Sequence, residues 1–263
     1  MKKLSLRILS IAFVVTALIG FQSCSEDAMP GDGETITSTE LQTILTTDEI
    51  AGAADFAIAE LYNGNTTAKN ASTAKDDCYS ATYTDSGFDA TFNNCVLNGT
   101  DNVNGTVSVT YEAGEGNASF TATFTDFYVG TIKLNGTRTY QITANSTETT
   151  GSFTVTSNMS IELEDGYTIT EMGTKTLSIS FDENTQSVLF SLSGTWTVEM
   201  DENTYAVEIL DELQGNSTCQ NLTSGSMVVA KNGLAVTVDF GNGECDNIAT
   251  IIYPNGATEE ITL

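Results

Sequence analysis

After residue 78 the chain alternates apolar and polar residues with a period of two, and this constrains its fold more than any other feature. Such alternation is typical of antiparallel strands that bury one side and expose the other to solvent. The intervening residues are mostly Thr, Ser, Asp and Glu, and β-branched Thr suits the wet side of a strand. The runs are Val107–Tyr111, Phe120–Phe124, Phe153–Val155, Met159–Leu163, Leu177–Phe181, Val188–Leu192, Trp196–Met200, Tyr205–Ile209 and Leu234–Phe240.

Turn residues separate these runs at short intervals. Asn135-Gly136 fits a two-residue type I′ hairpin. Asp182-Glu183-Asn184-Thr185 recurs nineteen residues later as Asp201-Glu202-Asn203-Thr204, and Asp165-Gly166, Asn232-Gly233 and Asn255-Gly256 predict three further turns. About 12 strands are expected. The fold class is therefore mostly β, an antiparallel meander that forms a curved sheet, a sandwich or an open barrel, with one N-terminal α-helix packed on it.

One helix is expected, from about residue 47 to 62. Thr46 and Glu49 have capping-box spacing, and Asn63-Gly64 suits a helix end. Its apolar stripe would pack on the sheet, although a partner-binding helix is the alternative. The stripe consists of Ile50, Ala53, Ala54, Ala57, Ile58 and Leu61.

The N-terminus looks like a processed leader. Lys2, Lys3 and Arg7 precede an apolar run at 8–21 that suits a secretory signal and is short for a membrane span. The run ends at Cys24, in a context that resembles a bacterial lipobox, so residues 1–23 are expected to be removed and Cys24 acylated. Residues 24–45 would be a flexible tether and 46–263 a single β-rich domain. The acidic Ser25-Glu26-Asp27 resembles a surface-export signal of Bacteroidota lipoproteins.

Charge and composition exclude several function classes. After residue 23 the chain keeps six basic and 35 acidic residues, a net charge near −29, which argues against nucleic-acid binding. The sequence has no histidine, which removes Ser-His-Asp and Cys-His catalysis and His-ligated zinc. Four cysteines remain besides Cys24. An oxidising compartment favours disulfides, and the shortest loops are closed by Cys78–Cys95 and Cys219–Cys245, while zinc bound by four cysteines is the alternative.

Several residues are candidates for ligand contact. The oxygen-rich turns could hold calcium at Asp182, Asn184, Asp201 and Asn203, or they could simply be turns. Lys133 and Arg138 would face each other across the expected hairpin, so either neighbouring carboxylates pair with them or they hold an anion. Aromatic side chains could stack on sugar rings, and the adjacent Phe127 and Tyr128 must point to opposite sides. Trp196 is in phase with Val198 and Met200 and is expected to be a core residue, and Tyr140 is a further candidate for stacking on a sugar ring. The strand carboxylates Glu162, Glu164, Glu199 and Glu208 could support glycoside hydrolysis or form a solvated acidic surface.

Two segments, FTATFTDFYVGTIKLNGTRTYQI at 120–142 and VTVDFGNGECDNIA at 236–249, together with the Cys24 leader, resemble an uncharacterised family of Bacteroidota surface lipoproteins. The resemblance implies an outer-membrane location and an all-β fold. The expected function is that of a non-enzymatic, lipid-anchored binding, adhesion or accessory module at the cell surface, with no cofactor except possible calcium. Its partners would be the membrane, through lipid on Cys24, and a glycan or protein ligand, not nucleic acid. The alternatives are a carrier of an apolar ligand in a curved-sheet cavity and a carboxylate-based glycoside hydrolase.

Overall fold

The computed structural model describes residues 36–67, 73–75, 78–96, 102–112, 118–144, 150–182, 187–219 and 221–263. Cys24 and Asn184 lie outside these residues. Helix α1 spans Ser38–Thr67. The strands are β1 Thr73–Lys75, β2 Tyr79–Thr84, β3 Gly87–Cys95, β4 Val103–Glu112, β5 Ala118–Val129, β6 Ile132–Ala144, β7 Thr150–Glu162, β8 Thr168–Asp182, β9 Ser187–Met200, β10 Asn203–Asn216, β11 Ser224–Lys231, β12 Leu234–Asn242, β13 Ile248–Ile252 and β14 Thr258–Thr262.

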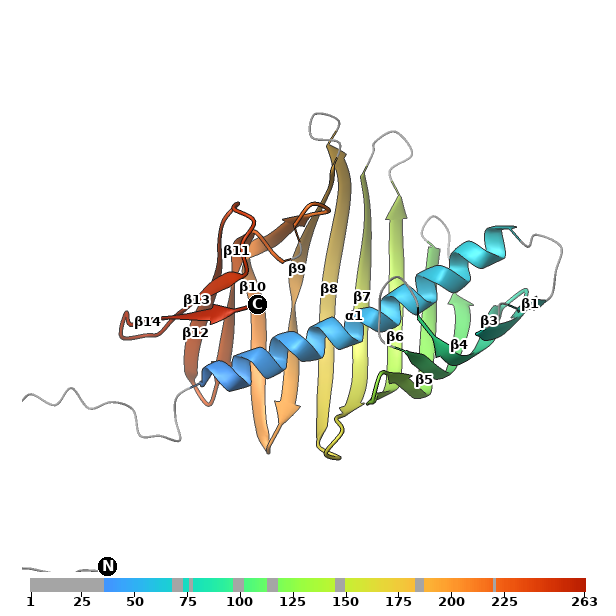
Figure 1. The fold of residues 1–263 in the computed structure, drawn as a ribbon, viewed down its shortest axis with the longest axis horizontal. Helices are drawn as coiled ribbons and strands as arrows, with labels where there is room; N and C mark the ends of the chain where they lie inside the picture. The colour runs from blue at the N-terminus through green and yellow to red at the C-terminus, as the bar shows by residue number, and fades with distance from the viewer. Residues whose placement is uncertain are drawn as a thin grey trace, which may run out of the picture.

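The strands form one open, antiparallel sheet in which every strand pairs with its neighbours in the sequence, from β1 to β14 (Figure 1). The predicted antiparallel meander is confirmed as a single curved sheet, with 14 strands among the described residues where about 12 were expected. The turn at Asn232-Gly233 is confirmed, and both residues have positive φ, as a primed hairpin turn requires. The outermost strands are short, and β14 carries Glu259 and Glu260, features that discourage pairing with another sheet.

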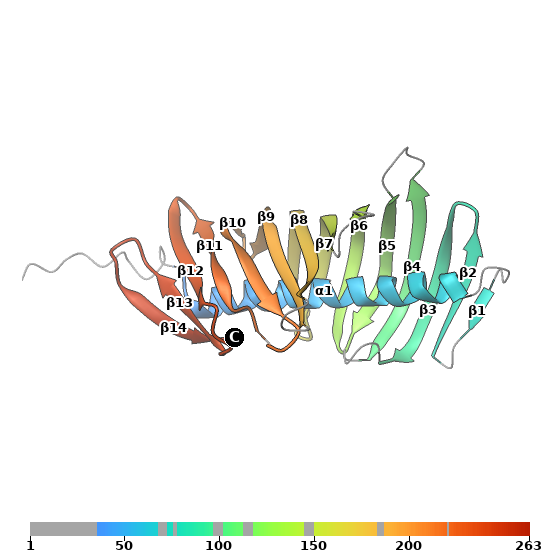
Figure 2. The same cartoon turned by 90° about the horizontal axis from the view of Figure 1, so that it is seen from above.

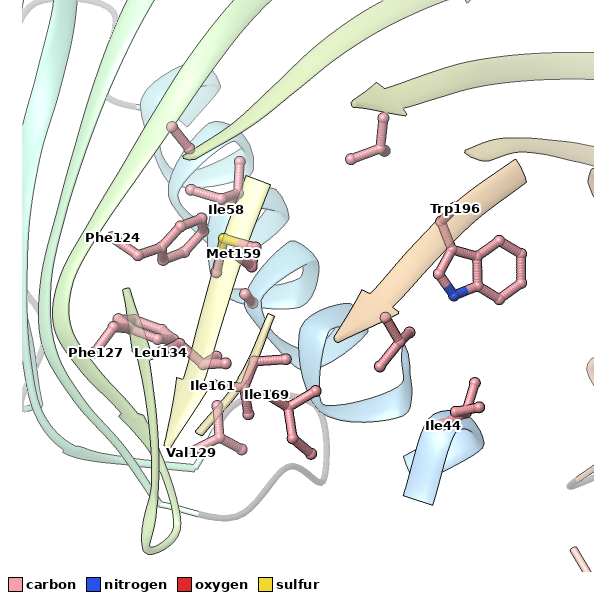
Figure 3. Packing of buried hydrophobic residues seen from close by; sticks show 14 of the residues in the cluster. Ile44, Ile58, Phe124, Phe127, Val129, Leu134, Met159, Ile161, Ile169 and Trp196 are labelled. Atoms are coloured by element: carbon pink, nitrogen blue, oxygen red, sulfur yellow. The ribbon is translucent and has the colours of Figure 1, made fainter. Parts of the chain in front are cut away.

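Helix α1 crosses the strands on one side of the sheet, called here the inner face, and runs from β11 toward β2 (Figures 1 and 2). The opposite side is the outer face. The predicted alternation sends the apolar residues inward. Figure 3 shows buried side chains from the helix and the strands packed together. They include Ile44, Ile58, Phe124, Phe127, Met159, Ile161, Ile169 and Trp196. Phe127 packs edge-on against both Phe92 and Phe124.

The helix is longer than the sequence pattern predicted. It begins at Ser38, and the capping box is formed by Thr37 and Glu40: the Glu40 carboxylate accepts a hydrogen bond from the Thr37 backbone N–H at 2.7 Å, and Thr37 Oγ1 accepts one from the Glu40 N–H at 3.2 Å. Thr46 therefore lies inside the helix, and residues 38–45 belong to the folded domain and not to a tether. Ile36, Leu41 and Ile44 are fully buried, which explains why this segment is held on the sheet. The helix also continues past Asn63-Gly64 to Thr67.

The predicted hairpin at Asn135-Gly136 was also wrong, because these residues lie inside β6. The turn between β5 and β6 falls at 130–131, since Val129 pairs with Ile132. Asn135 instead lies beside an irregularity in β5, where its Oδ1 accepts a hydrogen bond from the Asp126 N–H at 2.8 Å. Asn135 lies opposite a bulge of β5, while β6 itself continues without interruption through Asn135-Gly136.

Candidate functional site

Three acidic residues of α1 lie at its contact with the inner face: Glu40, Asp48 and Asp55. They are eight and seven residues apart, so they lie on the same side of the helix. Each forms an ion pair with a basic residue of a different strand. The three basic residues are half of the six that follow Cys24 in the sequence. The helix–sheet contact is therefore unusually rich in paired charges.

The first pair joins Glu40 to β11. Lys231 Nζ lies 2.7 Å from the Glu40 carboxylate, and the Tyr205 hydroxyl of β10 donates to the same oxygen. The Lys231 ammonium also lies 5.4 Å from the centre of the Tyr205 ring. Burial raises the pKa of Glu40, but the hydrogen bonds from Lys231, Thr37 and Tyr205 outweigh burial and lower this pKa to about 2. Glu40 is thus held as a carboxylate.

The second pair joins Asp48 to Lys175 of β8. Lys175 Nζ also lies 3.1 Å from Glu171 Oε2 on the same strand and 4.3 Å from the centre of the Trp196 ring on β9. The Glu171 side chain is completely buried. The Lys175 ammonium group therefore contacts two carboxylates and one aromatic ring at the middle of the interface.

The third pair joins Asp55 to Arg138 of β6, with Arg138 Nε 3.2 Å from Asp55 Oδ1. The Tyr140 hydroxyl donates to the same oxygen at 2.5 Å. Burial raises the pKa of Asp55, and Arg138 and Tyr140 act against that rise. Burial also raises the pKa of the Tyr140 hydroxyl well above its usual range, and the neighbouring Asp55 charge adds to the effect. The Tyr140 hydroxyl therefore stays a donor.

The spacing of the acids matches the spacing of the strands. Seven helical residues rise about 10.5 Å, and β6 and β8 are two strands apart, about 9.6 Å. Eight residues rise about 12 Å, against about 14 Å for the three steps from β8 to β11. A shift of α1 by one residue would move all three carboxylates away from their partners. The ion pairs thus fix the position of the helix along the sheet.

Within the part of the chain that the structure describes, four buried polar atoms near the second and third pairs have no hydrogen-bond partner, besides Arg138 Nε, whose contact with Asp55 is an ion pair without hydrogen-bond geometry. The four are Arg138 Nη1, Ser157 Oγ, Glu171 Oε1 and Trp196 Nε1. Register places Arg138, Ser157, Gly173 and Trp196 side by side on four neighbouring strands, with Glu171 two residues from Gly173. Two of these atoms are donors, one is an acceptor and the Ser157 hydroxyl can act as either. The cluster retains hydrogen-bonding capacity that the protein does not use.

The structure separates the residues that the sequence proposed as an anion or sugar site. Arg138 is buried beneath α1, whereas Lys133 lies toward the outer face and binds Glu162 of β7 at 2.7 Å. Lys133 and Arg138 each pair with a carboxylate, as the first of the two alternatives expected, and they do not lie together to hold an anion. Phe127 is fully buried, so it cannot contact a ligand. Tyr128 is half-buried and pairs across the strands with Lys133, so these two are the only candidates of the four that lie together.

Asp182 and Asn203 lie at opposite ends of β9, where they pair with Ser187 and Met200 respectively. Fourteen strand residues span about 45 Å, so the side chains of Asp182 and Asn203 cannot bind the same calcium ion. Asp201 and Glu202 both have positive φ, which identifies their segment as a primed hairpin turn. Among the described residues no group of three or more Asp, Glu or Cys could hold a metal ion.

The strand carboxylates do not converge on one cleft. Glu199 and Glu208 line two different shallow pockets, of about 410 and 390 Å³, and Glu162 is held by Lys133. The cysteines, in contrast, lie where expected. Cys78 and Cys95 have Cα atoms 5.2 Å apart, and Cys219 and Cys245 have Cα atoms 5.5 Å apart, so both predicted disulfides are confirmed.

The outer face of β5–β9 carries a regular array of hydroxyl groups. Thr121, Thr139, Thr156, Thr174 and Thr195 occupy one row across the five strands. With the rows above and below, fifteen positions contain no charged residue, and they are called here the hydroxyl face. The other ten are Ser119, Gln141, Thr154, Thr176, Ser193, Thr123, Thr137, Asn158, Met172 and Thr197. Hydroxyl groups meet across strands, as at Thr121–Thr139 (2.8 Å) and Thr154–Thr176 (2.9 Å).

The inner face has an uncovered apolar part. On β8, Leu177, Ile179 and Phe181 follow Lys175 on the same side, and Val188, Phe190 and Leu192 of β9 pair with them. These six residues are called the apolar ledge. Phe181 and Val188 are each 40% exposed and Ile179 is 38% exposed, so the apolar surface extends beyond the part that α1 covers. Single exposed apolar residues are common, but a contiguous set calls for an explanation.

Sequence reasoning missed the three helix acids, and of their basic partners it considered only Arg138. A signal was present, because Arg138 is in phase with the inward Tyr140, and Lys175 with Leu177 and Ile179. A basic residue in the buried phase of a strand requires an acidic partner. Glu40 could not be identified as a partner because residues 38–45 were assigned to the tether. Asp48 and Asp55 lie in the predicted helix, but the sequence does not show which strands that helix crosses.

Comparison with models of known families, with curated proteins and with solved structures found no match to this chain. The resemblance to Bacteroidota surface lipoproteins therefore stays a prediction. Within the described residues, no helix combines the length and the apolar character that crossing a membrane requires.

Proposed function

We propose that this chain is a non-enzymatic binding module, attached to the outer membrane by lipid on Cys24 and facing the cell surface, and that the hydroxyl face is its contact surface. The leader and the cysteine context support the attachment. The ligand is an uncharged polysaccharide.

The observation that carries the proposal is the absence of charge from the fifteen positions of the hydroxyl face in a chain that has 35 acidic residues. Charged groups such as Asp126, Glu162 and Glu199 lie at its margin. Ser119 and Thr121 of the face donate to the Glu112 carboxylate of β4. Over the other thirteen positions a neutral ligand can approach without displacing water from an ion, a step that is costly when it is not compensated. An anionic polymer would be repelled by the surrounding carboxylates.

The chemistry of threonine suits such a ligand. Each Thr offers a hydroxyl that donates and accepts, beside a methyl group. Neighbouring strands are about 4.8 Å apart, and alternate residues of one strand about 6.8 Å apart, so the groups form a repeating pattern. A polymer of repeating sugar units can meet such a pattern at many points, and many weak contacts then add to a useful affinity.

A charge placed in the middle of the hydroxyl face tests this proposal. The mature protein would be mixed with insoluble neutral polysaccharides and with anionic ones, and the bound fraction measured by sedimentation. Wild-type protein is expected to bind a neutral polysaccharide, and Thr156→Glu with Thr174→Glu to reduce that binding at least tenfold. Thr237→Glu, a matched change on the outer side of β12, should leave it unchanged. Binding to no neutral polysaccharide, or equal binding by the Thr156→Glu, Thr174→Glu protein, would reject the proposed contact surface.

A further inference from the structure

The apolar ledge has a location and a size that together indicate its occupant. It continues the inner face from Lys175 toward the C-terminal end of β8. There the exposed Phe181 of β8 pairs with the exposed Val188 of β9. Register places no charged side chain among its six residues. The ledge lies within the sheet and not at its edge, so the backbone groups there are already paired. A ligand at this place gains apolar contact but no backbone hydrogen bonds.

The exposed area is small. Three large apolar side chains, each about 40% exposed, present roughly 200 Å² if a full side chain offers 150–200 Å². A stable protein partner buries about 800 Å² on each side, and a second copy would also bring a net charge near −29. A peptide segment would gain no backbone hydrogen bonds there, since the backbone groups of β8 and β9 are already paired. A hydrocarbon chain needs no such bonds and fits a strip three residue pairs long.

We propose that the apolar ledge shelters an acyl chain carried by this chain's own Cys24 while the protein is away from a membrane. The inference depends on the acylation of Cys24 in the proposed function. It goes beyond that function because it gives the lipid a second binding place, on the protein itself. In water the exposed acyl chain would otherwise promote aggregation, since hydrocarbon that leaves water favours association.

The length of chain before the helix permits this contact. Glu40, in the first turn of α1, contacts Tyr205, which pairs with Val198 of β9. Val188 is ten residues away along the same strand, about 33 Å. Twelve residues separate Cys24 from Ile36, and they can extend over about 40 Å. The Cys24 sulfur can therefore reach the ledge while α1 remains docked.

A tryptophan placed on the ledge reports its occupant. The full chain with Phe181→Trp would be produced with lipoprotein processing, its Cys24 acylation verified by mass spectrometry, and its fluorescence recorded after detergent removal. We expect its emission to lie at shorter wavelength than that of the same variant with Cys24→Ala. Trp196 is buried and adds the same background to both proteins. Val188→Trp provides a second reporter on the ledge should Phe181→Trp fail to fold.

Leu189→Trp is the matched control, because Leu189 is 38% exposed on the opposite side of β9, and its emission should not depend on acylation. Equal emission of the acylated and Cys24→Ala forms of both ledge reporters would overturn the inference. So would a shift produced only by added palmitate, since the ledge would then bind a foreign lipid. A mass spectrum without acylation would instead reject the lipid attachment in the proposed function, so the two failures are distinguishable.

Discussion

Asp48 of the helix and Lys175 of β8 form an ion pair at the centre of the helix–sheet interface, although 127 residues separate them in the sequence. The same ammonium also neutralises the fully buried Glu171. Burying charges costs free energy, and here that cost is offset only while each charge keeps its partners. The stability of this fold therefore depends on a few complete charge clusters as well as on apolar packing.

Replacing Lys175 by Met should destabilise the protein strongly. It removes the ion-pair partner of the buried Glu171 carboxylate, and breaking a buried pair in this way costs about 3–5 kcal/mol. The free energy of unfolding, measured by urea titration, should fall by about 3 kcal/mol or more. Lys133→Met is the control, since its partner Glu162 is 44% exposed and little change is expected. Equal effects of the two substitutions would contradict this account.

The Glu40 cluster should make stability depend on acid pH. The pKa of Glu40 is lowered from 4.5 to about 2 in the folded protein, so its carboxylate contributes stability above about pH 4.5. That contribution is lost as the pH falls from about 4.5 toward 2, because the unfolded chain takes up the proton first. The difference in melting temperature between wild type and Glu40→Gln, measured from pH 6 to pH 2, should shrink over this range. A constant difference would be inconsistent with the assignment.

The helix cap gives a third prediction. Thr37→Ala removes the side-chain oxygen that accepts a hydrogen bond from the Glu40 N–H, and loss of such a cap costs about 1 kcal/mol. Thr46→Ala, in the middle of the helix and exposed, should cause no loss, because Ala is the better helix former. Chemical denaturation of the two variants checks both values. A larger loss of stability for Thr46→Ala than for Thr37→Ala would instead support a helix that begins near residue 47.

Two glycines should respond to alanine in opposite directions. Gly52 lies inside α1, and a Cβ there would meet no atom within 4 Å, so Gly52→Ala should stabilise the protein by about 0.5–1 kcal/mol. Gly173 of β8 lies against Trp196, and a Cβ would collide with both its backbone and its Cβ. Gly173→Ala should therefore cost at least about 2 kcal/mol. Thermal unfolding of both variants distinguishes these effects, and an increase for Gly173→Ala would show that β8 and β9 can separate freely.

The sequence predicted the parts of the fold that depend on local pattern. Alternation at Val107–Tyr111 and Trp196–Met200 is visible without knowing the partner strands, and Asn232-Gly233 specifies its own turn geometry. Asn135-Gly136 misled because the same pair also suits a bulge within a strand. The helix start was misplaced because Ile36, Leu41 and Ile44 stand among Thr and Glu residues, so their burial depends on a sheet that forms far along the chain.

The candidate surfaces were harder to predict than the fold. A run of Thr in one strand predicts only a solvent-exposed side of that strand. The alignment of Thr156 with Thr174 and Thr195 depends on the register between strands. From the sequence the ledge residues are expected to be buried, because Phe181 and Val188 alternate in step with buried residues. They are exposed because α1 does not cover this part of the sheet. The sequence suggested Arg138 as a possible anion contact and gave no role to Lys175. Their acidic partners on α1 lie more than 80 residues away in the sequence.

The order of the strands has a consequence for folding during synthesis. Each strand pairs with the one made just before it, so the sheet can grow step by step as the polypeptide emerges. The helix emerges first, yet its anchoring side chains follow 85, 127 and 191 residues later, at Tyr140, Lys175 and Lys231. Docking of the helix is therefore completed only after β11 has been synthesised and paired, and a chain that stops before Lys231 leaves Glu40 without its cation.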